Sequence, residues 1–465
     1  MITAIQRDTG IFGTPKKDKI GSIFGREVNT SQMNNMQNSP LIQADSEHKN
    51  VIYLLLTEGG TKVLSFLSFV IMARGLSQQS YGVVALAFSV GSLFYIFFNL
   101  GLDYHIIRDI KHLLQVKTHG ALQELTSTVA TIKVWFFPIF GVAFGIIFWV
   151  MRWNIMYFPV MFFIFLYFYL TSIIQLILFF FRAFEKMVYE FVTRVVLASV
   201  LVIVALLFGY LYKKPLLLSI SYVITAGIIF LGILIFFIKK TGLTPHISRW
   251  VNKRELTLFG KTKYLFLTGI CTSIFFSIDV LIISYLRGIE DVAIYKNAVM
   301  ITLALFFIPT AIVQGFYPKL VQHKVKLDEF FKTVKKILLR LIPLGIGTAA
   351  IFALVGPQLI VTFFGKSYTA SIPLFRISLI AFLLATIDQV LGYGMIAIGK
   401  YKEYFIITFI VAIMSVLLNS ILISKIGLMG GIITLNISHL LLILLPFTYL
   451  YFSFVNDKRK QYNTL

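Results

Sequence analysis

Residues 54–74 read LLLTEGGTKVLSFLSFVIMAR, an apolar run that holds a carboxylate, Glu58, and an ammonium, Lys62, near its middle. A helix needs about 20 mostly apolar residues to cross the hydrocarbon core of a bilayer. Charged side chains inside that core are costly and usually mark a functional site. This stretch therefore predicts a membrane helix whose charged residues have a function.

The rest of the chain repeats the same apolar pattern. Of its 465 residues 58% are hydrophobic and only 13% are charged, whereas soluble domains are about a quarter charged. Helices satisfy their own backbone hydrogen bonds in lipid, and a barrel would show short alternating segments instead. We therefore predict an all-α polytopic membrane protein with about 12 transmembrane helices, at roughly 51–74, 82–102, 128–151, 156–181, 191–212, 215–238, 264–286, 294–316, 338–364, 372–397, 402–423 and 427–453.

The positive charge of the chain indicates its orientation. If the N-terminus is inside, most of the 42 Lys and Arg residues fall in segments on the cytoplasmic side. This agrees with the positive-inside rule, by which cytoplasmic loops carry an excess of Lys and Arg. We expect both termini in the cytoplasm, with 1–48 a disordered tail and 454–465 a short tail. Topology and anionic lipids then account for the net charge of +22, without a nucleic-acid partner. The basic, amphipathic loop at 320–338 is expected to lie on the inner membrane surface.

Enzyme signatures are absent from the sequence. The single Cys271 excludes an intramolecular disulfide, and no CxxC, Cys/His metal pattern, P-loop or nucleophile elbow occurs. We expect no enzymatic activity, no cofactor and no metal site.

A weak internal repeat divides the chain. ARGLSQQSYG (73–82) is similar to LRGIEDVAIY (286–295), and AFEKMVYEF (183–191) is similar to AIGKYKEYF (397–405), at offsets of 213 and 214. An even number of spans separates the copies, so both copies run in the same direction through the membrane. We predict an N-lobe at 49–238, a cytoplasmic loop at 239–263 and a C-lobe at 264–453. Many transporters are built this way, with the site between the lobes.

Polar residues inside the predicted spans are the candidate site. On helix 1, Glu58, Thr61 and Lys62 share one face with Ser65 and Ser68, which is typical of a helix that lines a wet cavity. A neutralised Glu58–Lys62 pair between helices is the alternative. The predicted substrate-cavity residues are Glu58, Lys62, Lys133, Lys296 and Arg376, and the ion-coupling candidates are Glu58, Asp279, Asp388 and His439.

Structural roles are the alternative for these residues. Each Lys or Arg could reach to the membrane surface or form a structural pair. His439 shares a face with Asn436 and could be a hydrogen-bonded packing residue. Pro309 is expected to kink the eighth span.

Several stretches resemble one family. The opening of the membrane region resembles Wzx-type polysaccharide exporters, which show an A-R-x-L-x-x-x-x-Y-G turn and then a G-L-D-x-x-x-x-R segment. The matching residues here are Ala73, Arg74, Leu76, Tyr81, Gly82, Gly101, Leu102, Asp103 and Arg108. SIDVLIISYLRGIEDVAIYKNA (277–298) and FFGKSYTASIPLFRI (363–377) resemble later parts of the same family, so the likeness extends over about 50–453.

The resemblance implies a V-shaped, two-lobed transporter, like multidrug and toxin extrusion (MATE) proteins, of the multidrug/oligosaccharidyl-lipid/polysaccharide (MOP) exporter superfamily. Its implied activity is that of a flippase in the bacterial cytoplasmic membrane. The implied substrate is an undecaprenyl-diphosphate-linked oligosaccharide for O-antigen, capsule or exopolysaccharide, moved by alternating access. A polysaccharide polymerase and a chain-length regulator are the implied partners. The alternative is a cation-coupled multidrug exporter of the same superfamily.

Overall fold

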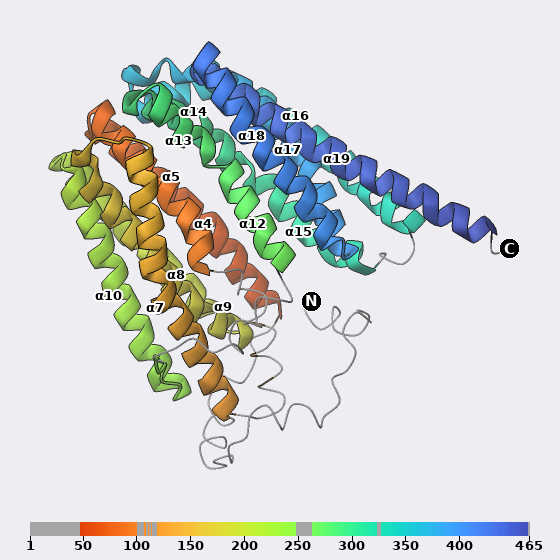
Figure 1. Ribbon diagram of the computed structural model, residues 1–465, viewed down its shortest axis with the longest axis horizontal. Coiled ribbons are helices and arrows are strands. Elements are labelled where there is room, and N and C mark those ends of the chain that lie inside the picture. Colours follow the sequence, from red (N-terminus) through yellow and green to blue (C-terminus); the bar gives the residue numbers. More distant parts are fainter. Residues whose placement is uncertain are drawn as a thin grey trace. The chain divides into compact units, whose positions relative to one another are not determined.

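The described part of the chain is helical and contains twelve candidate membrane spans. The computed structural model describes residues 47–99, 107, 110, 113, 119–247, 263–322 and 327–463, and no strand occurs in these ranges. Twelve helical segments are long and apolar enough to cross a membrane, which confirms the predicted all-α polytopic fold (Figure 1). Three predicted features lie outside the described residues. They are the N-terminal tail up to residue 46, the centre of the 239–263 loop, and the motif residues Gly101, Leu102, Asp103 and Arg108.

The chain forms two compact units. Unit 1 contains Val70–Ser89 and the chain from Leu267 onward, and unit 2 contains the described residues up to Phe69 together with Val90–Phe266. The end of the first span and the start of the second thus pack with the second half of the sequence. The lobe boundaries expected from the repeat stay a prediction.

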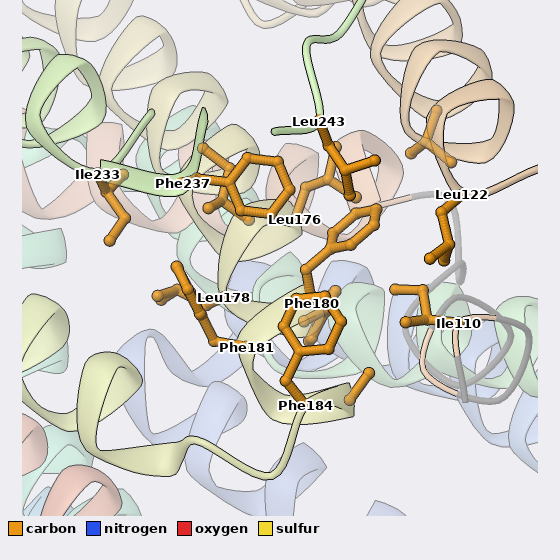
Figure 2. Packing of buried hydrophobic residues seen from close by; sticks show 14 of the residues in the cluster. Ile110, Leu122, Leu176, Leu178, Phe180, Phe181, Phe184, Ile233, Phe237 and Leu243 are labelled. Carbon is orange, nitrogen blue, oxygen red and sulfur yellow. The ribbon is translucent and has the colours of Figure 1, made fainter. Parts of the chain in front are cut away.

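Unit 2 packs its helices around an aromatic core. Phe180 and Phe181 lie at the end of α8, with their rings 5.3 Å and 5.9 Å from that of Phe237 on α10, and Phe184 and Ile233 belong to the same cluster (Figure 2). Bulky rings on both helices bury apolar surface at these helix ends. The helices that contribute to this unit are α4 (Glu47–Gly75), α5 (Gln78–Asn99), α7 (His119–Val150), α8 (Phe158–Ala183), α9 (Met187–Val204), which continues as the π-helical η2 (Ala205–Leu211), and α10 (Pro215–Thr241).

Unit 1 is arranged around α17 (Ser371–Ala397), which packs against α14 (Ile289–Leu305), α16 (Leu327–Phe364) and α19 (Leu428–Asn463). Because α19 continues to Asn463, the predicted tail at 454–465 begins as a helix. The remaining helices of this unit are α12 (Lys263–Phe275), α13 (Ile278–Leu286), α15 (Phe307–Gln322) and α18 (Tyr401–Ile426).

Two spans of unit 1 are interrupted in the middle. The seventh breaks between α12 and α13 at Phe276 and Ser277, and the eighth breaks between α14 and α15 at Phe306. Pro309 has no N–H for the carbonyl group four residues earlier, which agrees with the bend predicted for the eighth span. The break in the seventh span was not foreseen.

The segment predicted as a surface loop at 320–338 is instead largely helix. The start of α16 continues without interruption into the ninth span. Its apolar side chains Phe330, Val334 and Ile337 are buried in the same core as Val390 and Met395 of α17. The prediction of a membrane-surface loop was therefore wrong for this face, because the helical spacing gathers these side chains into a stripe that another helix covers.

Backbone geometry supports the internal repeat. Lys186 N donates to Phe181 O at 2.9 Å, and Lys400 N donates to Met395 O at 3.0 Å, 214 residues later. Three non-glycine residues of the first half have positive φ, and each has a glycine with positive φ 213 or 214 residues later. The pairs are Arg152 and Gly365, Glu185 and Gly399, and Lys213 and Gly427. The turn at Phe181–Lys186 therefore recurs at Met395–Lys400, and positive φ recurs at the equivalent positions of two other turns.

The segment Val70–Ser89 is held in unit 1 by side-chain contacts. Arg74 Nε donates to Phe363 O at 2.8 Å, and Tyr81 Oη donates to Asn297 Oδ1 at 2.6 Å. Gly82 lies against the first turn of α14, where an added Cβ would stand 2.1 Å from the carbonyl oxygen of Ile289. These contacts show what Arg74, Tyr81 and Gly82 each contribute at this turn.

Gly82→Ala should therefore destabilise the protein, by about 1–3 kcal/mol, because the methyl group must displace backbone of α14. Gly141→Ala is the matched control, since nothing lies within 4 Å of its added Cβ and alanine favours helix. The midpoint of thermal unfolding in detergent measures both variants. Equal midpoints for the two would contradict the tight contact at Gly82.

Candidate functional site

Glu58, in the polar stripe of α4, faces α9 within unit 2. Glu58 Oε1 accepts a hydrogen bond from Arg194 Nη1 at 2.7 Å. Two further contacts join the helices: the rings of Tyr53 and Phe191 lie 5.7 Å apart, and the position of an added Cβ on Gly60 is 4.0 Å from Val195. The ion pair with Arg194 therefore neutralises the intramembrane carboxylate across a helix pair.

Glu190 is the centre of this arrangement. Its side chain is only 1% exposed and accepts from Arg182 Nε at 2.9 Å and from Arg194 Nη1 at 3.4 Å. Arg182 Nη2 contacts the second carboxylate oxygen, which makes the pair bidentate. We call Glu58, Lys62, Arg182, Glu190 and Arg194 the α4–α9 charge cluster.

The α4–α9 charge cluster can present positive charge to a ligand. It contains three bases and two acids, and Lys62 is exposed and interacts electrostatically with both Glu58 and Arg194. Arg194 remains 27% exposed although two carboxylates hold its guanidinium group. A guanidinium and an ammonium side by side match the geometry and charge of phosphate oxygens.

Three members of this cluster were missed as site residues. From the sequence, Arg182 and Arg194 are expected among the cytoplasmic loop cations, and Glu190 is not singled out. In the structure Arg194 lies on α9, one turn beyond Glu190. The available signal was the i, i+4 spacing of an acid and a base at the edge of an apolar run.

Lys133 lies in a sealed environment. Lys133 lies within α7 and is only 5% exposed. Its Nζ donates to Phe98 O at 3.0 Å, to Ser172 O at 2.8 Å and to Asn99 Oδ1 at 3.3 Å. This geometry is that of a structural cation that joins α5, α7 and α8. These contacts do not support a cavity role for Lys133, which stays a prediction.

Asp279 and Lys296 come together in unit 1. Asp279 lies in the first turn of α13 and accepts from Tyr295 Oη at 2.6 Å and from Val280 N at 2.7 Å. A carboxylate is favourable at a helix N-terminus, so Asp279 stabilises the restart of the broken span. Lys296 donates to Ser89 Oγ at 3.0 Å and interacts electrostatically with Asp279.

Asp388 and His439 form a buried pair between α17 and α19. His439 Nδ1 lies 2.5 Å from Asp388 Oδ2, with exposed fractions of 2% for His439 and 8% for Asp388. Arg376, on the same helix as Asp388, is instead exposed. The structure thus brings together two of the predicted ion-coupling residues that lie 51 positions apart in the sequence.

A metal site is not formed by these acids. Among the residues that the structure describes, no group of three or more His, Cys, Asp or Glu side chains could hold a metal ion. The intramembrane polar residues therefore divide into the α4–α9 charge cluster, the cage around Lys133, the Asp279 group and the Asp388–His439 pair.

Glu190→Gln should destabilise the protein by about 1.5–3 kcal/mol, because two partly exposed arginines lose charged hydrogen bonds to it while Arg194 keeps Glu58. Glu403→Gln is the matched control on α18, where the pair with Lys400 at 3.8 Å is about one third exposed and contributes about 1 kcal/mol or less. Thermal unfolding in detergent compares the two variants. A smaller loss for Glu190→Gln than for the control would contradict a central role of Glu190.

Solved structures with the same fold are membrane transporters. A multidrug resistance MATE family transporter of the MOP superfamily in an inward-facing conformation matches with a TM-score of 0.66 and 14% identity, over 86% of this chain and 96% of that chain. The lipid II flippase MurJ, in an inward closed conformation, matches with a TM-score of 0.63 and 15% identity, over 86% of this chain and 87% of that chain.

A MOP superfamily transporter from Pyrococcus furiosus matches with a TM-score of 0.62 and 14% identity, over 92% of this chain and 98% of that chain. These likenesses show that the fold is the one seen in the MOP superfamily. Among curated proteins, none matches the chain significantly. A family model described as polysaccharide biosynthesis protein matches residues 48–324, more than half of the sequence, and the chain therefore belongs to the polysaccharide biosynthesis protein family.

Proposed function

We propose that this protein is a flippase for lipid-linked oligosaccharides, in particular undecaprenyl-diphosphate-linked repeat units destined for surface polysaccharide. It acts by alternating access in the bacterial cytoplasmic membrane, with both termini in the cytoplasm. The observation that carries the proposal is the α4–α9 charge cluster, in which an exposed Lys62 lies beside two partly exposed arginines within membrane helices of a polysaccharide biosynthesis protein. Transport breaks no covalent bond, so this function needs no catalytic group.

The chemistry of the cluster favours an anionic headgroup. A diphosphate offers several oxygens to Arg194 and Lys62, while the lipid tail can stay in the bilayer. Glu58 already accepts from Arg194 at 2.7 Å. An arriving phosphate would compete with this carboxylate for the guanidinium group, because both are acceptors of the same charge-assisted hydrogen bonds. Binding and the release of Glu58 are then one event.

A cation-coupled drug exporter is the second candidate. It is favoured by the structural match to a ligand complex of the MATE multidrug transporter DinF-BH, at a TM-score of 0.64 and 16% identity. The intramembrane carboxylates Glu58 and Glu190 could in principle attract cations. Both are held by arginines here, however, and the cluster as a whole has more bases than acids. For the Pyrococcus furiosus transporter, a reversed polarity of the binding pocket is reported to suggest a different function.

Deleting the gene tests the proposal directly. We expect lipid-linked repeat units to accumulate on the cytoplasmic leaflet and surface polymer to disappear, and the wild-type gene supplied on a plasmid should restore both. Unchanged surface polymer together with a new sensitivity to cationic drugs would refute the flippase and support the exporter.

Lys62→Gln should weaken binding of an undecaprenyl diphosphate headgroup by about tenfold, because a charged hydrogen-bond partner contributes about 1.5–3 kcal/mol. Lys425→Gln is the charge-matched control, an exposed lysine in the last turn of α18. Binding to the purified protein and headgroup translocation in proteoliposomes measure both variants. Full activity of Lys62→Gln at wild-type protein levels would remove Lys62 from the site.

A further inference from the structure

The Asp388–His439 pair lies where the two interrupted spans of unit 1 break. The ring of His439 is 5.2 Å from that of Phe275, at the end of α12, and 6.2 Å from that of Phe276, in the break itself. Phe306, between α14 and α15, is 5.3 Å away. Coupling-ion sites in transporters are commonly built at such discontinuous helices. The position of the pair therefore suggests more than packing.

One ring nitrogen of His439 has no partner. Nδ1 faces Asp388, while Nε2 is buried and makes no hydrogen bond to any residue that the structure describes. A buried polar atom without a partner is costly, so this nitrogen requires an explanation. Nε2 is thus a free proton acceptor or donor at the helix breaks.

We infer that the Asp388–His439 pair is a proton-binding site of unit 1, whose occupancy is coupled to the helix breaks at Phe276 and Phe306. The pair takes up one proton from water and returns it to water, and no other bond changes. The coupling of the proton to transport rests on the proposed transport function. Proton binding itself can be tested without any substrate.

The chemistry of the site suits a proton better than a metal cation. Hard cations such as Ca²⁺ and Mg²⁺ require about six oxygen ligands. The pair offers one carboxylate, and the rings of Phe275, Phe276 and Phe306 offer no ligand. Histidine with a carboxylate neighbour is the side chain that most readily exchanges a proton near neutral pH.

In the described part of the chain, few titratable groups from neighbouring helices are found to interact with the Asp388–His439 pair. Tyr404 of α18 is the residue from another helix that interacts electrostatically with Asp388. The lysines at the start of α16 point outward and are exposed, away from the face that packs on α17. Other titratable groups on the surrounding helices include Cys271 of α12, Asp279 of α13, Tyr295 and Lys296 of α14, and Tyr393 of α17.

Protonation would act on the breaks through charge. With one shared proton the pair is neutral overall and tolerates the dry phenyl environment. Without that proton a carboxylate is left uncompensated, which is costly in a low-dielectric interior. Deprotonation therefore favours a conformation that admits water, and the interrupted backbone at Ser277 and Phe306 provides the place to open.

A pH gradient across proteoliposomes measures the coupling. If one proton moves per transported headgroup, a gradient of one pH unit should change the steady-state distribution about tenfold. We expect Asp388→Asn and His439→Gln to abolish this dependence while gradient-independent exchange persists. Thr386→Val is the control, a buried residue of the same helix whose hydroxyl bonds only Leu383 O among the contacts found. A wild type without gradient dependence would overturn the inference and leave the flippase intact.

Infrared titration of the purified wild-type protein separates the two proposals further. We expect a carboxyl or imidazole band that responds to pH when no lipid-linked substrate is present. This band should be absent in Asp388→Asn or His439→Gln. Failure of headgroup transport with this band intact would refute the flippase and keep the proton site. Absence of any such band, in a protein whose thermal unfolding is cooperative, would overturn the proton site even if transport persists.

Discussion

Each charge inside hydrocarbon has to be paired, and this constraint organises the polar interior of the protein. An isolated ion loses its hydration in a low-dielectric medium, so every intramembrane charge needs a partner or a path to water. The chain meets this requirement in different ways. Carbonyl oxygens surround Lys133, arginines flank Glu190, and a helix N-terminus with Tyr295 holds Asp279. What surrounds each charge indicates whether it supports the fold or serves transport.

The two units share backbone geometry but differ in chemistry. Two members of the α4–α9 charge cluster have aromatic counterparts. At the offset of 213 that relates Arg74 to Arg287, Lys62 corresponds to Phe275, and at the offset of 214 Glu190 corresponds to Tyr404. Both aromatic residues lie near the Asp388–His439 pair in unit 1. The duplicated scaffold therefore carries different polar residues in its two units.

Interrupted helices are a second difference between unit 1 and unit 2. The seventh and eighth spans break near their centres, while the fifth span of unit 2 changes only into a π-helical segment at its end. A broken span can bend at low cost because its backbone hydrogen bonds are already rearranged there. Asp279 and Tyr295 stabilise one side of the break, and aromatic rings fill the other. Such a junction is a suitable place for a change of charge to alter structure.

The sequence by itself determined the twelve spans and the repeat, because hydrophobicity over about 20 residues and recurring turn motifs are local signals. It also pointed to Glu58, Asp388 and His439, since charge in an apolar run is visible without a fold. Only the tertiary structure decided the partners. Arg194 and not Lys62 alone faces Glu58, and Asp388 meets a histidine 51 residues away. Pairing depends on which helices pack together, and apolar helix faces look alike in sequence.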